Sequence, residues 1–164
     1  MTYQSLGPVI GPDLTNVDDV AKFRINQEVD GFDGGLQKEG SFIYLNGVGS
    51  TVVGSLVTYA ANQGTTALAP ATGGIGQVAV AMAATVLGKF GWYQVRGLAA
   101  VKCPNSVAID ADVFALAATP GSVDDAVVAS EQILNAKFAS DTGSPASGLA
   151  YVQIDHPFFQ GRIT

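Results

Sequence analysis

One short segment of the sequence, GGIGQVAVAMAATVLG at residues 73–88, contains a pattern that could bind a dinucleotide. Gly74, Gly76 and Ala79 match the G-x-G-x-x-G/A fingerprint, whose glycines let the backbone approach a pyrophosphate. The fingerprint also requires a buried strand before it and an acidic residue about 20 positions later. Here the preceding segment is polar and contains a proline, and an arginine occupies the later position. We therefore predict a strand over residues 75–83, in which large and small side chains alternate, with an amphipathic helix as the alternative.

The other reactive side chains occur singly or in adjacent pairs. Asp155 and His156 are neighbours, but neighbouring strand residues project to opposite faces, so no dyad between them is expected. Cys103 is the only cysteine, and we interpret it as a small buried residue, although the lysine before it could lower the thiol pKa. The pairs Asp18-Asp19 and Asp124-Asp125 could bind a metal or exchange protons, and are better explained as turn or cap residues. We predict no catalytic residue, metal or cofactor, and hence no enzyme.

Charge is scarce and unevenly distributed along the chain. Charged residues make up 13% of the sequence, where about 25% is usual. No Asp, Glu, Lys or Arg occurs from Gly40 to Gly88, which suits burial against other subunits. The net charge is −6, and the basic residues are scattered singly, so nucleic acid is not an expected partner. The longest apolar run, Val78 to Leu87, has half the length of the roughly 20 residues that are needed to span a bilayer. The N-terminal sequence resembles no secretory signal. We expect synthesis in a cytoplasm and no membrane partner.

The remaining sequence predicts a β-rich domain. Glycines and prolines in residues 1–20 predict an extended arm, and Asn16 could cap one short helix. Asn46-Gly47 is a hairpin signal, and Pro120-Gly121 predicts a turn. About seven short strand candidates lie between such signals, as in β-sandwiches and barrels. The expected fold is therefore mainly β: an extended arm over residues 1–20, and a single β-sandwich or barrel of short strands over residues 21–164, with at most one or two short helices.

Several apolar side chains could contact a partner. In GWYQVRGLAAVKC the period of two places Trp92 and Tyr93 on opposite faces, so one is expected in the core and the other could meet a partner. In LAYVQIDHPFF the same period places His156 on the face of Val152 and Ile154. Phe158 and Phe159 follow, with core packing as the default, and the proline-punctuated arm could order along a neighbouring subunit. The candidate interface residues are Pro8, Ile10, Pro12, Leu14, Trp92, Tyr93, Phe158 and Phe159.

Four segments, IGQVAVAMAA, FGWYQVRGLAAV, GSVDDAVVAS and YVQIDHPFF, resemble in order and spacing the bacteriophage head decoration proteins, also called capsid cement proteins. In that family an F-x-x-G-x-x-x opening, an IG-x-AVAA strand, a YGW-x-Q-x-x-G strand and a terminal LNHPF-x-G-like strand recur. The similarity covers roughly residues 20–161, and GWYQVRG and DHPFFQG carry most of it. The matching parts are Phe23 onward, Ile75 to Ala84, Phe90 to Gly97 and Ile154 to Gly161.

The resemblance implies a non-enzymatic structural protein on the outer surface of an assembled phage capsid, where it would bridge neighbouring capsomers and stabilise the head. Its expected partners are the major capsid protein and further copies of itself, as a homotrimer or a dimer. The low charge agrees, since little charge would need desolvation at such contacts. Two other functions stay open: a carbohydrate-binding β module of a viral or surface fibre, with Trp92 and Tyr93 as stacking platforms, and an enzyme with a nicotinamide cofactor at Gly74 and Gly76.

Overall fold

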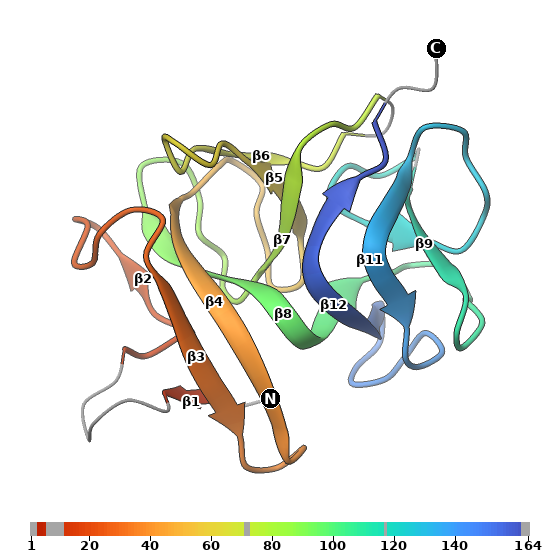
Figure 1. The fold of residues 1–164 in the computed structure, drawn as a ribbon, viewed down its shortest axis with the longest axis horizontal. Coiled ribbons are helices and arrows are strands. Elements are labelled where there is room, and N and C mark those ends of the chain that lie inside the picture. The colour runs from red at the N-terminus through yellow and green to blue at the C-terminus, as the bar shows by residue number, and fades with distance from the viewer. Residues whose placement is uncertain (1–2, 6–11, 71–72, 117, 162–164) are drawn as a thin grey trace.

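A computed structural model describes residues 3–5, 12–70, 73–116 and 118–161 of the protein (Figure 1). These residues form strands and connecting loops without a helix, which confirms the expected mainly-β fold. The strands are β1 (Tyr3–Ser5), β2 (Val17–Asp18), β3 (Glu28–Asp33), β4 (Lys38–Asn46), β5 (Leu56–Tyr59), β6 (Thr66–Leu68), β7 (Gln77–Ala81), β8 (Phe90–Lys102), β9 (Asp112–Ala115), β10 (Val123–Asp124), β11 (Gln132–Phe138) and β12 (Leu149–Phe159).

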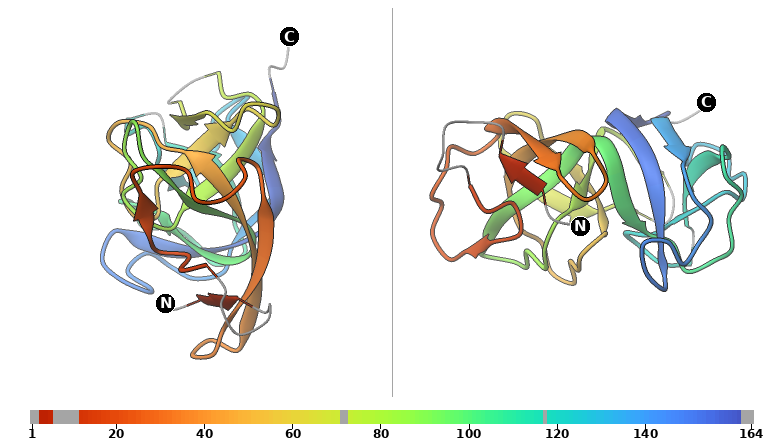
Figure 2. Two further views of the ribbon diagram at one scale, coloured as in Figure 1. Left: turned by 90° about the vertical axis from the view of Figure 1, so that its left-hand side faces the viewer. Right: turned by 90° about the horizontal axis from the view of Figure 1, so that it is seen from below.

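The strands form one antiparallel sheet that is organised around β8. The main order is β1-β3-β4-β8-β7-β12-β11-β9-β10, with β2 added to β8, and with β5 and β6 joined through β7. The first half of β8 pairs with β4 and β7, whereas its second half pairs with β12. Seen from below in Figure 2, β1 to β4 lie on one side and β9 and β11 on the other, with β8 running between them.

Gly97 is required where β8 changes partners. Its φ is +99°, a conformation that side chains rarely adopt. A Cβ atom at this position would also collide with the backbone of β4, at the Glu39 carbonyl oxygen and the Gly40 Cα atom. The glycine thus lets β4 approach β8 closely before β8 turns toward β12.

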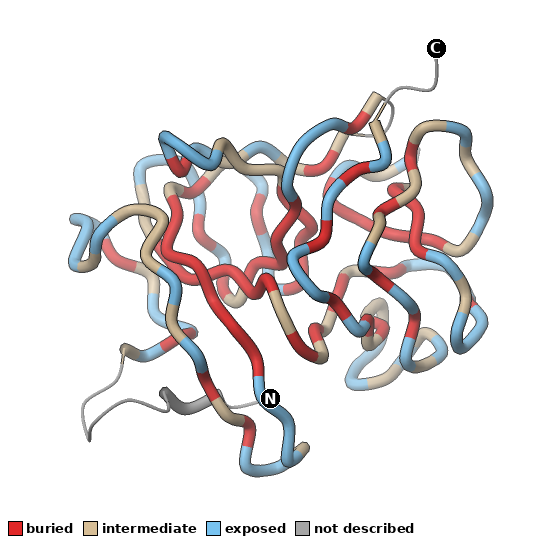
Figure 3. Tube along the Cα trace, viewed as in Figure 1, coloured by how far each residue is buried: buried red, intermediate tan, exposed pale blue. Residues whose placement is uncertain are grey.

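Both faces of β8 are buried in its first half, and three hydrophobic clusters result. Trp92 packs with Phe42 and Tyr44 on one face, with the Trp92 and Tyr44 rings 5.0 Å apart. Tyr93 packs on the other face with residues of β4, β5 and β7. The third and largest cluster fills the space between β7, β9, β11, β12 and the second half of β8. Figure 3 shows the burial along most of β4 and the first half of β8.

The strand expected in the glycine-rich segment is confirmed, although β7 covers only residues 77–81. Gly76 precedes it with a φ of +92°, so the chain turns directly into the strand. β7 pairs with β5, β8 and β12. A dinucleotide turn offers the N–H groups of a helix N-terminus to the pyrophosphate, and here a strand follows instead. The geometry therefore does not support the nicotinamide hypothesis.

Two local expectations are wrong. Residues 16–20 form no helix, because Val17 and Asp18 pair with Gly91 and Phe90 of β8 and Asn16 donates to the Asp18 carboxylate rather than capping. Asn46-Gly47 makes no tight hairpin either. The Gly47 N–H donates to the Lys89 carbonyl, and the chain continues through a long loop to β5, which pairs with β6 and β7. In both segments, hydrogen bonding to β8 or to the residue just before it determines the backbone conformation.

The turn predicted at Pro120-Gly121 is confirmed between β9 and β10. The described part of the N-terminal segment is integrated into the sheet of its own chain. β1 pairs with β3, and the Leu14 side chain is 1% exposed in the cluster around Trp92.

Candidate functional sites

The adjacent acid and base near the C-terminus do contact each other, contrary to the expectation from an alternating strand. His156 has a φ of +46°, and it lies where the register of β12 against β11 shifts. This irregularity turns His156 away from the buried face of Val152 and Ile154, so Asp155 and His156 are both exposed. The Nδ1 atom of His156 lies 3.1 Å from Oδ1 of Asp155. A positive φ at a non-glycine residue was not detectable from the sequence.

A second carboxylate faces the other ring nitrogen. The Nε2 atom of His156 lies 3.6 Å from Oε2 of Glu28, on β3. A histidine that activates a nucleophile uses one ring nitrogen for the orienting acid and keeps the other for the nucleophile. Here carboxylates occupy both sides, so the arrangement is that of a polar cluster linking β12 to β3. Asp155 lies opposite Arg96 of β8. Arg96 Nε in turn donates to Ser41 Oγ (2.9 Å), and Ser41 Oγ donates to Asp30 (2.6 Å).

The other reactive residues have structural partners. Cys103 is fully buried, and burial raises the pKa of its thiol, opposite to the effect considered for the neighbouring lysine. Asp124 accepts from the side chain of Asn105 (2.7 Å), and Asp125 accepts from the backbone of Ala108 (2.9 Å), so the pair holds this loop in place. Within the described residues, no group of three His, Cys, Asp or Glu side chains is arranged to hold a metal ion.

Asp18 is a buried carboxylate rather than an exposed turn residue. Its side chain accepts from the Tyr44 hydroxyl (2.7 Å) and from Asn16 (2.6 Å), and it forms an ion pair with Lys22 (2.7 Å). Burial raises its pKa, but the bonds from Lys22 and Tyr44 outweigh burial, so the pKa lies below its usual value. Its neighbour Asp19 pairs with Lys89.

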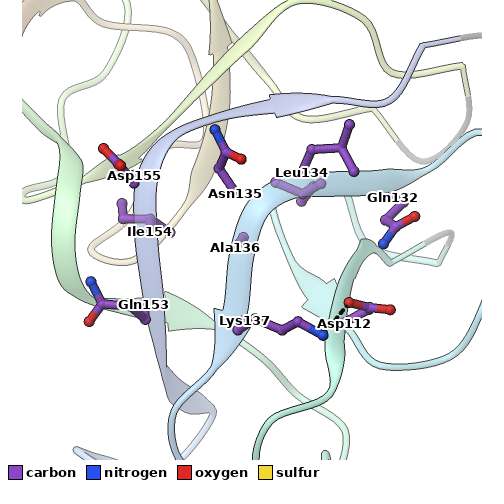
Figure 4. A pocket seen from close by; sticks show the side chains of 10 residues that line it. Asp112, Gln132, Leu134, Asn135, Ala136, Lys137, Gln153, Ile154 and Asp155 are labelled. Atoms are coloured by element: carbon purple, nitrogen blue, oxygen red, sulfur yellow. Dashed lines mark ion pairs between the residues drawn. The ribbon is translucent and has the colours of Figure 1, made fainter.

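The sequence did not reveal a groove on the outer face of β9, β11 and β12. Its volume is about 370 Å³, and Figure 4 shows the side chains that line it. Asn135, with a φ of +59°, lies where β11 changes register against both neighbours. The sequence contains one indication of this irregularity. The buried residues of β11 are Ile133, Ala136 and Phe138, and the spacing of three between the first two departs from the spacing of two in a regular strand.

A second surface of interest is apolar. The loop after β4 contacts the loop before β8, through hydrogen bonds from Gly47 to Lys89 and from Val48 to Thr85. The two loops carry four exposed aliphatic side chains, which we call the apolar loop surface: Val52, Val53, Val86 and Leu87. Val53 also lines an adjoining pocket of about 280 Å³ together with Met82 and Leu149.

Of the predicted interface residues that the structure describes, most are buried. Trp92 and Tyr93 are both buried, so the expectation that one of them is exposed is wrong, and neither can act as a stacking platform. The cause is the pairing of β8 with strands on both sides and its burial on both faces. Leu14 and Phe159 are also buried, and Pro12 is half-buried.

Phe158 is the exposed member of the C-terminal aromatic pair. Its side chain is 39% exposed, and β12 pairs here with β7 at Gln77, close to the exposed Ile75. The predicted contacts at Pro8 and Ile10 lie outside the described residues.

Comparisons of the chain with protein-family profiles, with curated proteins and with solved structures find no match. The described residues contain no helix long and apolar enough to cross a membrane.

Proposed function

We propose that the protein is a non-enzymatic structural protein that binds the outer surface of an assembled phage capsid, bridges neighbouring capsomers and stabilises the head. The observation that carries the proposal is the apolar loop surface, which lies within the uncharged stretch from Gly40 to Gly88. Exposed apolar side chains on two loops that contact each other suit a protein–protein contact site. Charge is depleted at the centres of such contacts.

The proposed attachment depends on the many equivalent binding sites of a capsid. A capsid offers many equivalent sites, so a contact of modest strength gains from the high effective concentration once neighbouring sites are engaged. The two loops are hydrogen-bonded to each other, from Gly47 to Lys89 and from Val48 to Thr85, which limits the entropy lost on binding. We propose a homotrimer or a dimer as the bound form, with the major capsid protein and further copies of this chain as the partners.

The first experiment is quantitative mass spectrometry of purified particles from the source. A copy number near that of the major shell protein, or a simple fraction of it set by the lattice, supports the proposal. A few copies per particle would instead place the chain in a tail or fibre, and absence from the particle would refute a structural role in the virion.

A matched pair of variants tests the surface. Leu87→Asp places a charge on the apolar loop surface, where the side chain is 77% exposed, and Val127→Asp changes an equally exposed side chain (84%) on a loop between β10 and β11. Burying an unpaired charge costs about 2 kcal/mol or more, so Leu87→Asp should weaken binding to stripped shells about 30-fold. Val127→Asp should bind like the unmodified protein. Equal binding by both variants would contradict the assignment of this surface.

A further inference from the structure

The groove on β9, β11 and β12 has the composition of a ligand site. Its polar walls include three side-chain amides, from Gln132, Asn135 and Gln153, and none of these amides makes a hydrogen bond within the described residues. Leu134, which is partly exposed, adds an apolar side chain to the lining, whereas Ile133 and Ile154 also border the groove but are each only 2% exposed. Polar groups without partners beside an apolar side chain are typical of small-molecule sites.

The groove exists because of two breaks in the strand pairing. Asn135 and His156 both have positive φ, and they lie on opposite sides of the same irregular stretch between β11 and β12. The pairing of β11 with β9 is also interrupted, between Ile133 and Lys137. Unfavourable backbone conformations of this kind persist where the surroundings hold them, and they cluster at binding sites.

The charged side chains at the groove already have polar partners. At one end, Lys137 Nζ lies 2.6 Å from Asp112 Oδ1, as Figure 4 shows by a dashed line. At the other end, Asp155 contacts His156. An anionic ligand would therefore find the Lys137 ammonium group occupied, and within the described residues the two carboxylates belong to no cluster that could hold a cation. An extended peptide is disfavoured as well, because β11 is paired on both sides and offers no free strand edge.

We infer that this groove binds a neutral saccharide. Side-chain amides donate and accept at once, as sugar hydroxyls do, and the partly exposed side chain of Leu134 suits the C–H face of a sugar ring. The volume of about 370 Å³ accommodates one or two sugar units. The described residues that line the groove include no aromatic side chain, so a single site should be weak, with a Kd in about the millimolar range. This binding is independent of the proposed attachment to a capsid.

The test is a titration of the full-length ¹⁵N-labelled protein with maltose, lactose and N,N′-diacetylchitobiose, followed by NMR. With at least one of these sugars, saturable shifts should appear in the backbone amides of residues 132–137 and 153–156. Asn135→Gly removes an amide while keeping a residue that favours positive φ, and Gln153→Ala shortens an exposed side chain. Each variant should weaken binding about fivefold or more, the effect of one lost hydrogen bond.

Gln63→Ala, which removes an exposed amide from the loop between β5 and β6, is the control and should bind with the original affinity. Spectra that superimpose outside the groove show that the variants are folded, and Gln153→Ala alone suffices if Asn135→Gly is not. The inference is overturned if none of the three sugars causes a saturable shift in the unmodified protein, or if the groove variants bind as tightly as Gln63→Ala. Gln153→Ala should still bind a capsid, so the two proposals fail separately.

Discussion

The bond between Tyr44 and Asp18 offers a quantitative test of how the N-terminal segment is attached. Asp18 is 3% exposed, and its carboxylate has three polar partners, of which the Tyr44 hydroxyl at 2.7 Å is the most deeply buried. Tyr44→Phe keeps the ring in the cluster with Trp92 and Phe23 and removes only the hydroxyl. Asp18 Oδ2 then loses its hydrogen-bond donor.

Loss of a hydrogen bond to a charged acceptor costs about 1.5–3 kcal/mol. For a chain of this length, each kcal/mol lowers the melting temperature by about 2–4 °C, so Tyr44→Phe should melt about 3–12 °C lower at pH 7. Tyr151→Phe is the control. Tyr151 is half-buried on β12, and its hydroxyl makes no hydrogen bond within the described residues, so its loss should cost less than about 0.5 kcal/mol.

The effect of pH on this difference has a defined sign. The folded state lowers the pKa of Asp18, so its contribution is complete above the unfolded pKa of about 4 and is lost as the pH falls below it. The gap between the unmodified protein and Tyr44→Phe should therefore be largest near neutral pH and shrink toward pH 3. Urea unfolding at pH 7, 5 and 3 measures it. A gap below 0.5 kcal/mol at pH 7, or one that does not change with pH, would refute the reasoning.

Three further predictions concern the core. Burial raises the pKa of Tyr44 and of Tyr59 to about 12, so the contribution of these two tyrosines to stability is complete below about pH 10 and is lost as the pH rises from about 10 toward 12. An absorbance titration should show these two tyrosines ionising at a higher pH than free tyrosine. Ionisation of all five tyrosines of the chain at pH 10 would contradict this prediction. Gly97→Ala should destabilise by about 2 kcal/mol or more in urea unfolding, because it combines a positive φ with a collision against β4, whereas Gly34→Ala meets open space and should cost far less. The Cys103 thiol, whose pKa burial raises, should react with a disulfide reagent only at the rate of unfolding, and fast labelling in native buffer would contradict its burial.

Local pattern predicted the main features of the fold. The alternation of large and small residues predicted β7, and the period of two in GWYQVRG correctly placed Trp92 and Tyr93 on opposite faces. The scarcity of segments with helical periodicity and the frequent turn residues predicted a mainly-β fold, which the structure has. These features depend on neighbours within a few residues, and the chain itself specifies them.

Tertiary structure decided which faces are covered and where the strands become irregular. Trp92 and Tyr93 are both buried because β4 and β7 pair with β8 and strands from distant parts of the chain pack on both faces, which periodicity cannot show. Asp155 contacts His156 only because the positive φ of His156 changes the direction of its side chain. The groove at Asn135 likewise results from register shifts against β9 and β12. Register is a property of strand pairs far apart in the sequence, so the sequence alone identified residue types and faces, and the pairing of the strands determined which of those residues form a surface.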